Sequence, residues 1–115
     1  MTEGDGALTA LPQSDGRAKP RPVILLRQMP PFGDWLICGV STQLHQQVAG
    51  FDETIEPLHP DFACTGLKAA SLIRLGFLAV LPTNRFLGIL GSISPERHAR
   101  LIQRLGEFLQ SERKG

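Results

Sequence analysis

The residue with the clearest chemical potential is Arg21, which lies between Pro20 and Pro22. Proline disfavours the helical region for the residue before it, so Arg21 is expected to have an extended backbone. The apolar run at residues 23–26 follows at once and predicts a strand that is buried on both faces. We therefore expect Arg21 at the mouth of a strand, where it could present a rigidly held cation to an anion. A solvated charge at a strand end would give the same pattern.

Two further cations precede Arg21, so that Arg17, Lys19 and Arg21 follow one another at alternate positions. They come directly after Asp15-Gly16, a pair that is typical of a tight turn. The three side chains could form a small rim that faces an anion. Charge alone does not distinguish such a rim from a solvated hairpin loop, and both interpretations stay open.

Small hydroxyl side chains end the next predicted strand, because Ser41 and Thr42 follow the apolar residues 35–40. A hydroxyl at a strand end often does no more than hydrogen-bond the adjacent turn. Taken alone, this pair is therefore interpreted as structural. His45 and His59 come later, without the spacing of metal ligands, and are expected to be solvated. The sequence predicts no metal site.

The composition limits the classes of function. The chain has 115 residues, enough for a single domain spanning 1–115 with one core, and its 12 basic and 11 acidic residues give a formal net charge of +1. This balance excludes a strongly basic protein that wraps nucleic acid, so an RNA or DNA contact must use a local patch. Cys38 and Cys64 fit neither a disulfide framework nor a zinc site and are expected to be reduced. No signal peptide or membrane-length apolar segment is present, which predicts a cytoplasmic protein without a membrane partner.

The apolar runs predict a mainly β fold. Strands are expected at residues 7–11, 23–26, 35–40, 71–80 and 85–90. A long loop at residues 44–67 should contain one short strand near 54–57. Gly39, Gly76 and Gly88 each interrupt an apolar run, as expected where the strands of a small barrel bend or carry bulges.

The end of the chain predicts a helix at about residues 95–112. Ser94 can cap it, Pro95 suits its first position, and Glu96 suits the positive end of its dipole. Apolar positions at helical spacing predict a stripe that faces the core: Leu101, Ile102, Leu105, Phe108 and Leu109. The charged residues are expected to be left largely to solvent: Arg97, Arg100, Arg104 and Glu107.

Together these features resemble the PemK/MazF family of toxins. The resemblance is carried by their order: Gly4-Asp5 before a strand, Asp15-Gly16 in a turn, Lys19-Pro20-Arg21-Pro22 before an apolar strand, Ser41-Thr42 after the next, Gly66-Leu67 before residues 71–74, and residues 89–94 before the helix. The similarity covers nearly the whole chain, and the order is more informative than any single motif.

The resemblance implies an SH3-like antiparallel β-barrel with a C-terminal helix, of the MazF/CcdB type, usually as a homodimer. It also implies a metal-independent endoribonuclease, an mRNA interferase of a type II toxin-antitoxin system, that uses no cofactor. Single-stranded RNA and a cognate antitoxin peptide would be its partners.

The resemblance also suggests roles for individual residues. The catalytic arginine of the family falls on Arg21, and its catalytic hydroxyl falls on Ser41, with Thr42 close enough to leave the choice open. An arginine that some members use falls on Arg74, and Arg17 and Lys19 would join it in binding RNA. Some members carry a carboxylate two residues after the arginine that falls on Arg74, and in this chain Gly76 stands there.

In this chemistry the 2′-hydroxyl of the RNA attacks the adjacent phosphorus, and a guanidinium can stabilise the phosphorane charge. Arg21 could do so, and either Arg21 or His45 could transfer protons. Two other classes of function stay open. A catalytically inactive SH3-like binding or regulatory module would suit Gly76 and the near-neutral charge. A gyrase-poisoning toxin of the CcdB type would need no arginine that faces phosphate, so the Arg-Pro and hydroxyl pattern favours RNA.

Overall fold

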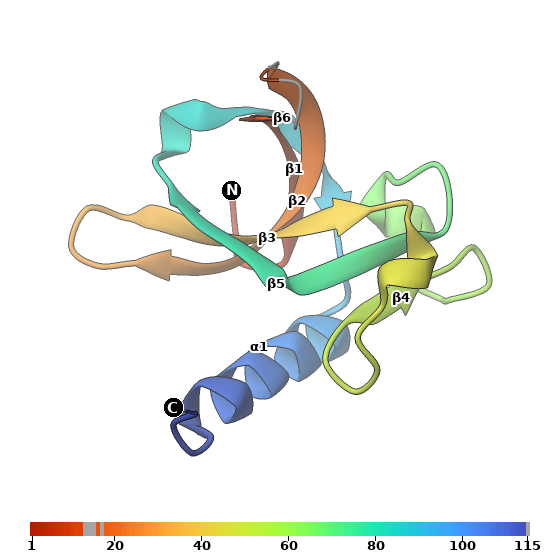
Figure 1. Ribbon diagram of the computed structural model, residues 1–115. Helices are drawn as coiled ribbons and strands as arrows, with labels where there is room; N and C mark the ends of the chain where they lie inside the picture. The colour runs from red at the N-terminus through yellow and green to blue at the C-terminus, as the bar shows by residue number, and fades with distance from the viewer. Residues whose placement is uncertain (13–15, 17, 115) are drawn as a thin grey trace.

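A computed structural model describes residues 1–12, 16 and 18–114, so the predicted RNA-binding residue Arg17 lies outside the described residues. One antiparallel sheet has the strand order β4-β5-β3-β2-β1-β6. The sheet curls into a barrel, and helix α1 runs beneath it (Figure 1). The elements are β1 (Asp5–Pro12), β2 (Ala18–Met29), β3 (Asp34–Ser41), β4 (Glu53–Ile55), β5 (Ser71–Leu81), β6 (Phe86–Ser92) and α1 (Pro95–Gln110). The predicted mainly β fold with a C-terminal helix is confirmed.

Strand β2 is much longer than the predicted residues 23–26, and Arg21 lies within it rather than at its mouth. Arg21 pairs with Thr9 of β1, and pairing with β3 begins only at Val23. Over its first residues β2 therefore pairs with β1 and has no β3 pairing on its other edge. Proline is tolerated at such an edge because it removes no ladder hydrogen bond there. Pro20 and Pro22 are two residues apart, so their missing N–H groups face the same edge.

The apolar run of β2 serves two hydrophobic clusters, because successive side chains point to opposite faces of a strand. Val23 and Leu25 belong to a cluster with Ala7, Trp35 and Ile37. Ile24 and Leu26 belong to a larger cluster that includes Leu101 and Leu105 of α1. The prediction that this run is buried on both faces is confirmed.

Helix α1 begins as predicted, with the Ser94 Oγ accepting a hydrogen bond from the Arg97 N–H at 3.1 Å. It ends at Gln110, two residues before the predicted end. The predicted apolar stripe is wrong in the last turn, where Phe108 and Leu109 are 55% and 69% exposed. Phe108 instead contacts the ring of Phe51 in the loop before β4, with 5.0 Å between ring centroids. Across the described part of the chain, no helix has both the length and the apolar character needed to span a membrane.

The loop at 44–67 contains the predicted short strand as β4, which begins one residue and ends two residues earlier than predicted. It also contains two short 3₁₀ turns, Leu44–Gln46 and Ala63–Thr65. The second turn lies directly against β6. A Cβ atom on Gly91 would collide with the backbone of Cys64 and Thr65. Glycine at this position therefore lets the loop pack against the last strand.

Replacing Gly91 with alanine should destabilise the protein by about 1–3 kcal/mol, because the backbone of the turn must move to admit the methyl group. Gly88 is a matched control on the same strand, since a Cβ there would meet nothing within 4 Å. Gly88→Ala should leave stability nearly unchanged or raise it slightly. Urea unfolding of the two variants measures the difference. Equal midpoints would show that the close packing at Gly91 does not contribute to stability.

Candidate functional site

A pocket of about 600 Å³ opens across β2, β3 and β5. It brings together four of the residues singled out in the sequence: Arg21, Ser41, Thr42 and Arg74. The other residues that line it are Leu11, Gly39, Val40, Gln43, Gln46 and Phe77. Two cations on β2 and β5 and two hydroxyls at residues 41–42, where β3 ends, therefore share one concave surface.

The sheet register explains this arrangement. Gly39 lies opposite Val23 on one side and opposite Arg74 on the other. Arg21 and Ser41 are each two residues from the Val23–Gly39 pair, so the alternation of side chains directs them to the same face as Arg74. Gly39 has no side chain, and the ring of Phe77 occupies the space beside it.

Strand β5 carries a bulge beside the pocket. Cys38 pairs with Leu78 and the next residue, Gly39, pairs with Arg74, so residues 75–77 have no partners on β3. The predicted bend at Gly76 is thus a bulge, a feature that often re-aims side chains near functional sites. Leu75 enters the core, whereas Phe77 packs next to Gly39.

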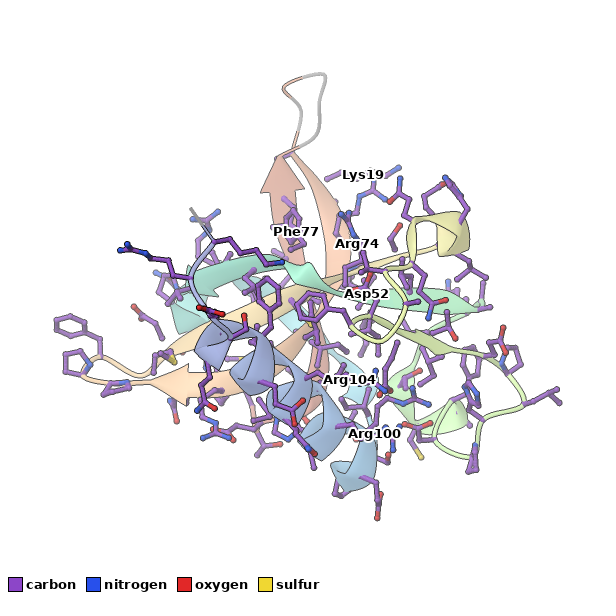
Figure 2. All side chains as sticks on the ribbon, turned by 60° about the horizontal axis from the view of Figure 1, so that its bottom comes forward. Lys19, Asp52, Arg74, Phe77, Arg100 and Arg104 are labelled. Atoms are coloured by element: carbon purple, nitrogen blue, oxygen red, sulfur yellow. The ribbon has the colours of Figure 1, made fainter. Side chains whose placement is uncertain are left out.

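The bulge is held by Asp52, a buried carboxylate in the turn before β4. Its Oδ1 accepts a hydrogen bond from the Leu75 N–H at 3.0 Å, and its Oδ2 accepts one from the Val48 N–H at 2.9 Å. Figure 2 shows Asp52 below Arg74 and Phe77. Sequence reasoning missed this residue, because a single loop acid carries no signal of a bond to a strand 23 residues away.

The remaining predicted residues are placed less centrally. Lys19 is exposed on β2 opposite Leu11 and does not line the pocket. His45 is exposed in the turn after β3 and also does not line it. The Ser41 hydroxyl accepts a hydrogen bond from the Gln43 N–H at 3.0 Å, which is the turn contact expected of such a residue, while Thr42 is exposed.

A second cluster of charges joins α1 to β4 and to the loop between β4 and β5. Here the prediction that Arg97 faces solvent is wrong. The Arg97 side chain is only 7% exposed and contacts Glu53 at 2.8 Å and Asp61 at 2.9 Å. Arg100 and Arg104 contact Glu53 at 2.9 and 3.0 Å from more exposed positions (Figure 2). All three arginines contact Glu53 and Arg97 also contacts Asp61, so this cluster is a clamp between elements.

The clamp shifts the ionisation of both carboxyl groups. Burial raises the pKa of Glu53, but hydrogen bonding and charge from Arg100, with the charges of Arg104 and Arg97, outweigh it and hold that pKa below its ordinary value. The hydrogen bond from Arg97 is the main cause that lowers the pKa of Asp61 from 3.8 to about 2. Both groups therefore favour the folded state when ionised.

Low pH should lower the free energy of unfolding, because Asp61 becomes protonated. Its pKa is lower in the folded state, so its stabilisation is complete above about pH 5 and is lost as the pH falls through 3.8 towards 2. The shift corresponds to about 2 kcal/mol. Urea unfolding should show Asp61→Asn to be less stable than the parent near neutral pH, with the gap closing at about pH 2. A gap that stays constant with pH would contradict this role for the ionised carboxylate.

Neither cysteine is in a disulfide, as predicted. Cys38 is buried, and its burial raises the pKa of the thiol to about 12. Cys64 is exposed. Among the residues that the structure describes, no cluster of three or more His, Cys, Asp or Glu side chains could hold a metal ion.

No family model matches the sequence, and no curated protein matches it. The structure, by contrast, is similar to that of the Mycobacterium tuberculosis toxin MazF-mt6, with a TM-score of 0.61. The match covers 93% of this chain and 99% of that chain at 15% sequence identity. At this identity the likeness concerns the fold. The chain has a MazF/PemK-like fold, as the order of its sequence features suggested.

Proposed function

We propose that this protein is a toxin-like endoribonuclease that cleaves single-stranded RNA by attack of the 2′-hydroxyl on the adjacent phosphorus. The observation that carries the proposal is the pocket that gathers Arg21, Arg74 and the hydroxyls of Ser41 and Thr42. The MazF/PemK-like fold supports it at the level of architecture.

Each group has a chemical part in this proposal. A guanidinium is always charged and offers a planar fork of N–H donors, so Arg21 would bind the oxygens of the phosphorane as charge develops. Arg74 would hold a neighbouring phosphate oxygen. Ser41 or Thr42 would donate a neutral hydrogen bond. We propose that the reaction needs no metal ion, because two guanidinium groups can meet the transition-state charge.

The test is cleavage of a mixed-sequence RNA by the purified protein in excess chelator. Cleavage should persist, and it should stop when the nucleotide at the scissile position carries deoxyribose, because the nucleophile is then missing. The bond from phosphorus to the 5′-oxygen breaks, so the upstream product should end in a 2′,3′-cyclic phosphate or its hydrolysed 2′- or 3′-phosphate, and the downstream product should begin with a 5′-hydroxyl. Cleavage of the deoxyribose substrate at the same bond would contradict the mechanism.

Gly76 favours a second candidate. It stands where the family resemblance leads one to expect a carboxylate in some members, and a pocket without that group could bind RNA without cleaving it. Such a binding or regulatory module would show affinity for RNA that depends on Arg21 but no cleavage of any RNA tried.

We further propose a cytoplasmic homodimer that binds an acidic antitoxin peptide. Exposed apolar side chains on β5 and β6, among them Leu78, Val80, Leu87 and Ile89, offer surface to a second copy. Light scattering in dilute solution measures the mass.

The antitoxin would bind over Arg17, Lys19 and Arg21, where an anionic segment gains charge-assisted hydrogen bonds and blocks phosphate entry. Its affinity should fall with added salt.

A further inference from the structure

Phe77 lies apart from the hydrophobic core, with its ring against Gly39. The residue is 39% exposed and belongs to neither of the two buried hydrophobic clusters among the described residues. It lines the pocket that also contains Arg21 and Arg74, and Figure 2 shows its label next to that of Arg74. An aromatic ring thus lies beside two cations at the same concave surface.

The backbone around Phe77 is built to present the ring there. A Cβ atom on Gly39 would lie 3.0 Å from Cδ1 and 3.2 Å from Cγ of Phe77, so the ring occupies the space that a side chain at position 39 would fill. At the residue that precedes Phe77 in the chain, a Cβ on Gly76 would meet nothing within 4 Å. The hydrogen bond from the Leu75 N–H to Asp52 fixes the bulge that carries the ring.

We propose that Phe77 is a base-stacking residue, which stacks one unpaired nucleobase of the RNA whose phosphates Arg21 and Arg74 hold. This inference rests on the proposed function and adds how the same pocket selects its substrate. Aromatic side chains bind splayed bases through their π-faces, and each such stack contributes about 1–3 kcal/mol. A base inside a duplex is already stacked on its neighbours, so the ring selects single-stranded RNA.

The side chains of Arg21, Arg74 and Phe77 recognise different parts of the nucleotide. The guanidinium groups recognise phosphate, which is the same in every nucleotide, and phenylalanine has no hydrogen-bonding group with which to read the edge of a base. Stacking therefore orients the nucleotide in the pocket with little dependence on base identity. Fixing a base and its phosphate together aligns the sugar between them, which carries the nucleophile.

The test measures binding of a short, fluorescently labelled single-stranded oligodeoxynucleotide, which lacks the 2′-hydroxyl and is not cleaved. Phe77→Ala should raise the Kd by about 5- to 150-fold, the loss expected for one stacked base. Phe77→Leu should lose nearly as much, because leucine keeps apolar volume but has no π-face, whereas Phe77→Trp should bind at least as tightly as the parent. Phe32→Ala is the matched control, since Phe32 is 86% exposed in the turn before β3 and does not line the pocket.

A series of oligonucleotides with one base removed at each position in turn shows whether the ring acts by stacking. With the parent protein, removal of one particular base should raise the Kd. With Phe77→Ala, removal of that base should cost no more than removal of any other. An unchanged Kd for Phe77→Ala would overturn the inference.

Two further outcomes would also overturn it. If Phe77→Ala weakens binding but also lowers the mass in light scattering, the ring contacts a second copy of the chain instead of a base. If the parent binds no oligonucleotide and cleaves no RNA, the proposed function fails together with the inference. RNA cleavage that depends on Arg21 but not on Phe77 would leave the proposed function standing and remove only the stacking role.

Discussion

Arg21→Ala should lower the single-turnover rate of RNA cleavage by about 10²-fold or more, the effect of losing a donor that stabilises transition-state charge. Arg21 lies on β2 beside the pocket hydroxyls, where a phosphorane could meet its guanidinium. Arg21→Lys should recover little of the rate, because an ammonium keeps the charge and loses the two-pronged geometry. Ser41→Ala or Thr42→Ala should cost less, since each removes one neutral donor.

Arg27→Ala is the matched control for this experiment. Arg27 is an exposed arginine on the same strand, it contacts Glu3 at 3.3 Å, and it does not line the pocket. Its variant should cleave at the parental rate. Equal rates for the parent and Arg21→Ala would mean that the active site lies elsewhere or that the nuclease is a contaminant.

Arg97→Ala should lower the free energy of unfolding by about 3–5 kcal/mol, the cost of leaving buried charge without its partner. Glu53 is 7% exposed and Asp61 is 11% exposed, and Arg97 donates hydrogen bonds to both. Arg100 and Arg104 would still contact Glu53, whereas Asp61 would lose its Arg97 contact. Urea unfolding monitored by Trp35 fluorescence measures the change.

The same Arg27→Ala control separates the clamp from an ordinary surface ion pair. Its side chain is 52% exposed, and an exposed pair contributes about 0–1 kcal/mol. Arg97→Ala combined with Asp61→Asn should recover part of the loss, because no unpaired carboxylate remains at position 61 while Glu53 keeps its contacts with Arg100 and Arg104. A similar small effect of Arg97→Ala and Arg27→Ala would show that the clamp contributes little to stability.

The sequence predicted the strands and the helix because their signals are local. Arg21 was singled out from its local sequence, whereas the roles of Ser41 and Arg74 came only from the family resemblance. The register of β2, β3 and β5 brings the three residues to one pocket. The length of β2 was underestimated because prolines weaken a strand pattern, and only the pairing with β1 shows that they lie at an edge.

Arg97 was misplaced although a signal existed. It lies four residues before Leu101 and eight before Leu105, on the buried stripe of α1, but its charge was taken as a reason for exposure. Phe108 continues the helical period without being buried. Asp52 and Phe77 could not be assigned from the sequence, because the first acts across 23 residues and the second depends on the geometry of a bulge.

The bulge on β5 determines which catalytic groups this pocket could acquire by substitution. A Cβ atom at Gly76 would meet no atom within 4 Å, and the glycine does not have the positive φ that would strain a side chain. Its neighbour Leu75 is fixed by Asp52, so the backbone on that side is already set. A carboxylate could therefore be installed at position 76, between Arg74 and Phe77, with little penalty in folding. A single substitution at position 76 could therefore add an acid or base to the pocket or remove one from it.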